Sequence, residues 1–133
     1  MASIHKDILI SAPASAVWDA VRDFGALHTR LVPGFVLDTR LDGEARIVTF
    51  SNGTVARELL VDSDDARRRL AYAAVSERLT QHSASIQIIA DGDDRCRMIW
   101  TTDVLPHAIA PYISTQMDQG ALAVQAAFGG KTA

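Results

Sequence analysis

Apolar and polar residues alternate along most of the first 105 positions, and this period of two predicts strands. The alternating runs are separated by short clusters of turn residues, of which Asn52-Gly53 is the clearest hairpin signal. The pattern predicts seven strands, at residues 4–10, 35–41, 45–50, 54–62, 68–75, 81–90 and 95–105.

Two other regions have the spacing of helices. Val17, Val21 and Phe24 recur at helical intervals after Pro13, which suits a first helical turn, and residues 26–31 predict a second short helix. Residues 107–128 carry a long apolar stripe with Pro111 near its start, and we expect one long helix there.

The order of these elements predicts an α+β fold, because the helices are segregated from a run of antiparallel strands. A sheet of seven strands twists and curls, and its concave face needs a cover. We therefore expect a curved seven-stranded antiparallel sheet around the long C-terminal helix, with two short helices after the first strand. The length suits a single domain over residues 1–133.

Strand alternation also predicts which side chains face the helix. His82, Ala84 and Ile86 share one face of their strand, and Leu70 and Tyr72 share one face of theirs.

Two strands leave the assignment open. Either Arg57 or Glu58 faces inward, and Trp100 faces inward unless a bulge turns Asp103 in.

Composition narrows the class of protein. Hydrophobic residues make up 48% and charged residues 22% of the chain, with a net charge of −3, which is typical of a globular protein and gives no basic footprint for nucleic acid. There is a single cysteine, no signal-peptide pattern and no apolar stretch long enough to span a membrane, so we expect a cytoplasmic protein. The sequence contains no metal-ligand, dinucleotide or phosphate-binding motif, and we expect no metal and no cofactor.

Several segments resemble a known superfamily. The opening "ISAPASAVWDAVRDFG", followed by "RELLVDSDDARRRLAYAAV" and "ERLT", resembles the polyketide cyclase/dehydrase-like group of the START-like superfamily, which has the helix-grip fold. The resemblance covers almost the whole chain and implies a cavity between the sheet and the long helix that holds a hydrophobic ligand. It also implies that Glu58, Tyr72 and His82 face the cavity and that Arg78-Leu79 lies at its mouth.

The expected ligand-binding residues combine this resemblance with strand and helix parity. They are Glu58, Leu60, Tyr72, Ala74, Arg78, Leu79, His82, Ala84, Ile86, Trp100, Asp103, Ile113, Met117, Gly120, Ala121 and Val124.

Three functions fit such a cavity. The first is binding of a lipid, isoprenoid or polyketide-like molecule for carriage or sensing. The second is an aromatase/cyclase-type enzyme in which Glu58, His82 and Tyr72 provide acid–base chemistry on a carbonyl substrate. A protein-interaction module is the third. We favour binding, because the predicted pocket holds few titratable groups; the oligomeric state is left open.

Overall fold

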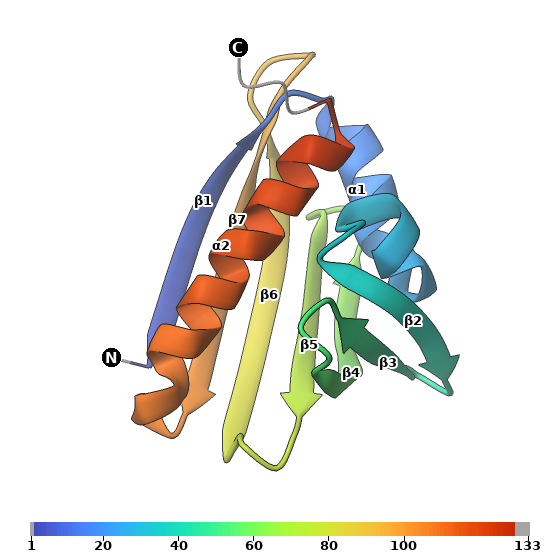
Figure 1. Ribbon diagram of the computed structural model, residues 1–133. Coiled ribbons are helices and arrows are strands. Elements are labelled where there is room, and N and C mark those ends of the chain that lie inside the picture. Colours follow the sequence, from blue (N-terminus) through green and yellow to red (C-terminus); the bar gives the residue numbers. More distant parts are fainter. Residues whose placement is uncertain (1, 130–133) are drawn as a thin grey trace.

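The computed structural model describes residues 2–129, and the elements follow the expected order (Figure 1). The strands are β1 (Ser3–Ile10), β2 (Val36–Asp42), β3 (Ala45–Phe50), β4 (Val55–Asp64), β5 (Arg69–Val75), β6 (Gln81–Ala90) and β7 (Cys96–Leu105). The helices are α1 (Ala14–Arg22), the short turns η1 (Phe24–Ala26), η2 (Leu27–Leu31) and η3 (His107–Ile109), and α2 (Ala110–Ala127).

All seven strands form one antiparallel sheet in the order β1-β7-β6-β5-β4-β3-β2. The first strand therefore pairs with the last, and every other neighbour is joined by a hairpin. The register shifts at two places, between Val36 and Asp38 and between Leu60 and Asp62, where bulges bend the strands. The expected helix-grip architecture is confirmed.

The helices close the concave side of this curved sheet. α2 runs along β1, β7 and β6, while α1 and η2 cover the end near β2 (Figure 1). α2 buries Met117, Gly120 and Val124, whose helical spacing puts them on one face against the sheet.

The short helices differ slightly from the prediction. The second one is a 3₁₀ turn followed by a π turn rather than an α-helix, and the long helix is preceded by the 3₁₀ turn η3. α1 is anchored to the turn that follows β4, because the Trp18 indole donates a hydrogen bond of 2.9 Å to Asp65 in that turn.

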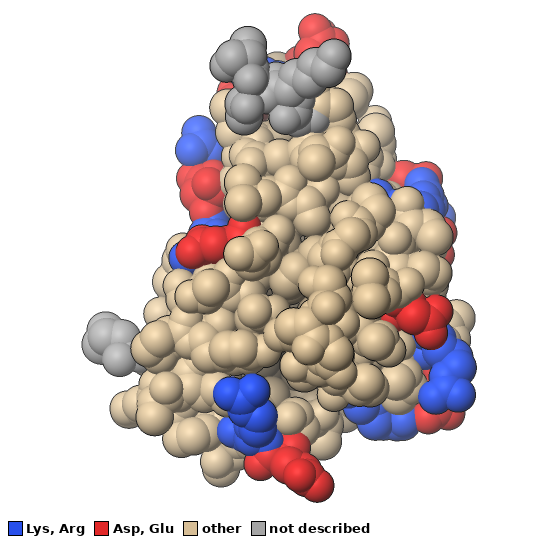
Figure 2. Space-filling view, viewed as in Figure 1, with Lys and Arg blue, Asp and Glu red and all other residues tan. Residues whose placement is uncertain are grey.

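Uncharged side chains occupy the middle of the face that carries α2 and η2. In Figure 2 the Lys, Arg, Asp and Glu side chains of this face gather along its edges. None of the helices in residues 2–129 has the length and apolar character needed to cross a membrane. Within this described part of the chain, two charged side chains, those of Arg46 and Glu58, are buried inside the molecule.

Candidate functional site

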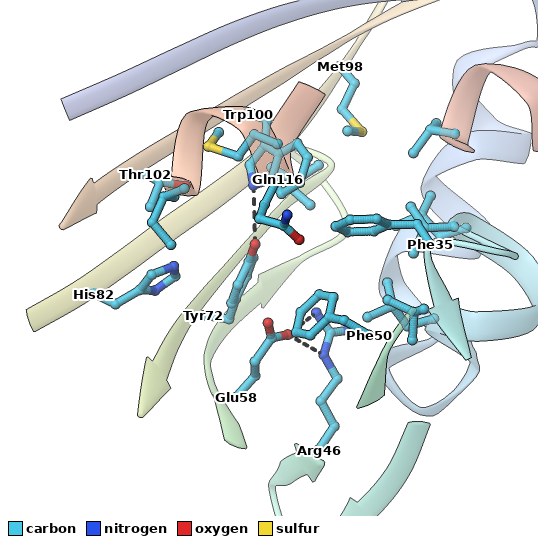
Figure 3. A pocket seen from close by; sticks show the side chains of 18 residues that line it. Phe35, Arg46, Phe50, Glu58, Tyr72, His82, Met98, Trp100, Thr102 and Gln116 are labelled. Atoms are coloured by element: carbon cyan, nitrogen blue, oxygen red, sulfur yellow. Dashed lines mark hydrogen bonds and ion pairs between the residues drawn. The ribbon is translucent and has the colours of Figure 1, made fainter. Parts of the chain in front are cut away.

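A cavity of about 110 Å³ lies between the concave face of the sheet and α2, and we call it the inner cavity (Figure 3). Strands β3 to β7, the segment 27–36 and α2 all contribute to its wall. Its apolar lining includes Leu27, Leu31, Phe35, Phe50, Ile86, Met98, Ile113, Met117 and Val124. Its polar lining consists of Arg46, Glu58, Tyr72, His82, Trp100, Thr102 and Gln116.

Arg46 and Glu58 form a buried ion pair at the floor of this cavity. They are direct cross-strand partners in β3 and β4, and their side chains are 4% and 9% exposed. Arg46 Nε and Nη2 lie 2.8 and 2.7 Å from Glu58 Oε1, and Nη1 donates to the Phe24 carbonyl at 3.2 Å. The guanidinium also stacks on the Phe24 ring at 4.0 Å. Each of the three guanidinium nitrogens of Arg46 thus has a partner, and both contacts with Glu58 end on the same oxygen.

Tyr72 and Trp100 form the second polar pair, and the Tyr72 ring lies 5.4 Å from the guanidinium carbon of Arg46. The Trp100 indole donates to the Tyr72 hydroxyl at 3.1 Å (Figure 3). Gly120 in α2 permits this placement, because a Cβ at that position would lie 3.0 Å from the Trp100 ring. Burial, reinforced by the charge of Glu58, raises the pKa of Tyr72, so the phenol keeps its proton at neutral pH.

His82 is the third polar group that faces the cavity from a neighbouring strand. Its Nδ1 accepts a hydrogen bond of 3.0 Å from the backbone N–H of Ala74. Burial lowers the pKa of His82, so the ring is neutral at neutral pH and carries its proton on Nε2. The ring is therefore a donor toward the cavity.

A second cavity of about 100 Å³, the outer cavity, adjoins the first. Five residues line both: Phe50, Glu58, His82, Ile113 and Gln116. The outer cavity reaches the loops after β3 and β5, where Asn52 donates to the Tyr112 hydroxyl at 3.0 Å and Arg78 stacks on the Tyr112 ring at 4.6 Å. These contacts join both loops to the start of α2.

The structure brings together most of the residues predicted from the sequence. The inner cavity is lined by Glu58, Tyr72, His82, Ile86, Trp100, Ile113, Met117 and Val124. The outer cavity adds Ala74, Arg78 and Leu79. The open choice in β4 is resolved by the Arg46 pair, because Glu58 is buried and Arg57 lies on the outer face.

Five predicted residues do not line either cavity. Asp103 is wrong as an inward residue: β7 pairs with β1 and β6 without a bulge, so alternation turns Trp100 and Thr102 in and Asp103 out, where it accepts a hydrogen bond from Ser3 at 2.6 Å. The other four are buried in α2 or pack in or against the hydrophobic core. They are Leu60, Ala84, Gly120 and Ala121.

Sequence reasoning missed the residue that pairs with Glu58. Alternation in β3 places Arg46 with Val48 and Phe50 on the concave face, but this strand's parity was not used. Phe35 and Gln116 were missed as well, since they come from the loop before β2 and from a polar position of α2. No group of three or more His, Cys, Asp or Glu within residues 2–129 is arranged to hold a metal ion.

Comparison with known proteins places this geometry in a family. The chain resembles solved structures of an uncharacterised protein from Bacillus thuringiensis (19% identity, 96% of this chain and 98% of that chain, TM-score 0.85) and of a START superfamily protein from Mycobacterium smegmatis (13%, 98% and 99%, 0.77). A norcoclaurine synthase point mutant from Thalictrum flavum has the same fold (20%, 98% and 96%, 0.74). A comparison with curated proteins found no match. Residues 1–128 match the family described as "Polyketide cyclase / dehydrase and lipid transport", and the chain belongs to that family.

Proposed function

We propose that the protein binds a hydrophobic small molecule in the inner cavity, for carriage or sensing. The observation that supports this is a hollow of about 110 Å³ with mostly apolar walls and a few hydrogen-bonded polar groups. Such walls provide affinity through burial, and the sparse polar groups fix orientation.

The family supports the same class of ligand. Its description includes lipid transport. A norcoclaurine synthase structure of similar fold contains dopamine and hydroxybenzaldehyde, so a related protein accommodates small aromatic molecules.

Binding fits the polar groups better than acid–base catalysis does. An efficient general base needs a free lone pair and a pKa near the working pH. The Nδ1 lone pair of His82 is used by Ala74, and the pKa of Tyr72 is raised, so both groups face the cavity as hydrogen-bond donors. An aromatase/cyclase mechanism would have to rely on Glu58, which is already bonded to Arg46.

The test is a titration with para-cymene, an uncharged aromatic hydrocarbon that can extend from the inner cavity into the adjoining outer one, followed by NMR. We expect saturable shifts of the Trp100 indole N–H, because this ring lines the inner cavity. Ile113→Trp should abolish them by filling both cavities, whereas Val55→Trp, at a 56% exposed position outside, should not. Decanol, an uncharged long-chain alcohol, is titrated in the same way. Binding that persists in Ile113→Trp, or the absence of a saturable shift with both compounds, would contradict the proposal.

A further inference from the structure

The charges inside the inner cavity cancel. Arg46 and Glu58 are the only residues with full charges among its described lining, and they neutralise each other within 2.8 Å. Each guanidinium nitrogen of Arg46 already contacts Glu58 or the Phe24 carbonyl, so the charge of Arg46 is compensated within the pair. An anionic ligand would meet the carboxylate of Glu58 and find no free cation, which is costly in an apolar space.

Three of the lining side chains have donors or acceptors that no described residue uses. No described residue donates to Glu58 Oε2, so this oxygen is free to accept a hydrogen bond. The Tyr72 hydroxyl accepts from Trp100 and retains its own proton to donate. His82 accepts at Nδ1 and presents an Nε2–H. Beside the neutral side chains of Thr102 and Gln116, these three groups thus offer the cavity one strong acceptor and two donors.

These three groups are held on adjacent strands. Glu58 lies in β4, Tyr72 in β5 and His82 in β6, and the rings of Tyr72 and His82 are 5.9 Å apart between centroids. The volume limits what can reach them, because a cavity of about 150 Å³ holds a molecule of the size of benzene. A ligand that fills the inner cavity and extends past His82 into the outer one is therefore compact.

We propose that the ligand is uncharged and compact, with a hydroxyl that donates to Glu58 Oε2 and a carbonyl that accepts from Tyr72 or His82. This inference rests on the proposed function and narrows its ligand class: free fatty acids and other carboxylates are excluded from the inner cavity. An anionic group could lie only at the mouth, beside Arg78 in the outer cavity.

The test uses compounds of nearly equal size in calorimetric titrations. Para-hydroxyacetophenone carries both groups, para-isopropylphenol only the hydroxyl, para-methylacetophenone only the carbonyl, and para-cymene neither. Para-hydroxybenzoate replaces the ketone with a carboxylate. We expect para-hydroxyacetophenone to bind about tenfold or more tightly than para-cymene, the single-group compounds to lie between, and the carboxylate to bind most weakly of the phenols.

The matched variant is His82→Asn. Asn retains an acceptor near the position of Nδ1 for Ala74 but removes the Nε2–H. The variant should bind the two ketones severalfold more weakly and bind para-cymene and para-isopropylphenol with unchanged affinity.

The outcomes separate the two proposals. If para-cymene binds as tightly as para-hydroxyacetophenone, or if the carboxylate binds as tightly as the ketone, the ligand class is wrong although binding stands. If His82→Asn leaves the binding of the two ketones unchanged, or weakens the binding of all the compounds equally, His82 is not the donor to the carbonyl and Tyr72 is the remaining one. If none of the compounds nor decanol binds, both proposals fail together.

Discussion

Arg57 and Glu58 are neighbours in β4, and each forms an ion pair, yet the two pairs lie in opposite environments. Arg57 pairs with Asp42 on the outer face, where the side chains are 44% and 60% exposed. Glu58 pairs with Arg46 on the inner face, where they are 4% and 9% exposed. Water can replace either partner of the outer pair, but nothing replaces a partner of the inner one. The same strand thus contributes to an exposed ion pair that is dispensable and to a buried one from which neither partner can be removed alone without a large cost.

The largest expected effect comes from breaking the inner pair on one side. Arg46→Met leaves Glu58 buried without its cation, and we expect a loss of about 3–5 kcal/mol in the free energy of unfolding. Urea denaturation followed by circular dichroism measures it.

The double variant Arg46→Met/Glu58→Leu is the control for this prediction. With both charges removed, stability should return close to that of the wild type. A single variant as stable as the wild type would mean that water reaches Glu58 despite its burial.

A smaller effect is expected at the other inner pair. Tyr72→Phe removes the acceptor of the Trp100 indole N–H, and an unpaired buried donor costs about 1–3 kcal/mol. Urea midpoints give the size of the change. Tyr112→Phe, which removes a hydroxyl at the mouth of the outer cavity, should destabilise the protein less. Equal losses of stability in the two variants would show that the buried Trp100–Tyr72 hydrogen bond stabilises no more than the exposed one.

The third prediction concerns pH. The lowered pKa of His82 means that the unfolded chain binds this proton more tightly, so folding stability falls as the pH drops below about 6.5. Protonation would also place an N–H on Nδ1 against the N–H of Ala74. Between about pH 7.5 and 5.5, His82→Asn should lose less stability than the wild type, as measured by thermal unfolding.

The exposed His107→Asn change serves as its control. A wild-type pH dependence that persists unchanged in His82→Asn would assign the titration to another group.

The smallest expected effect lies on the outer face. Asp42→Asn breaks the pair with Arg57, but both groups remain solvated, and salt already screens their attraction. The urea midpoint at physiological ionic strength should stay within repeat error. A loss of stability comparable to that of Arg46→Met would contradict the inference that the buried ion pair matters more than the exposed one.

The fold could be predicted from sequence because each element carries its own periodic signal. Alternation set the strands to within a residue or two, and the spacing of Val17 and Val21 or of Met117 and Val124 set the helices. The π turn Leu27–Leu31 gave no separate signal, because apolar spacing does not distinguish it from a short α-helix.

The site was harder to predict because it depends on register between strands. A two-residue turn at Asn52-Gly53 would place residue 47 opposite residue 58. Instead, Gly53 adopts a left-handed conformation (φ +88°) in a longer loop, and Arg46 lies opposite Glu58. Asp103 faces inward only if β7 contains a bulge, and the continuous pairing of β7 with β1 and β6 excludes one. Alternation predicts which face of the sheet a residue occupies, but the residue opposite it on the next strand depends on the length of the connecting turn.

The pairing of β1 with β7 also constrains how this molecule is made. Ser3 pairs with Asp103, so β1 finds its neighbour only after the five strands and the helices between them have been synthesised. Contacts so remote in sequence slow folding, and an unpaired edge with apolar residues favours aggregation while it waits. We therefore expect the nascent chain to acquire its hollow interior late, once β7 is available, and to be most vulnerable to misassembly just before β1 docks.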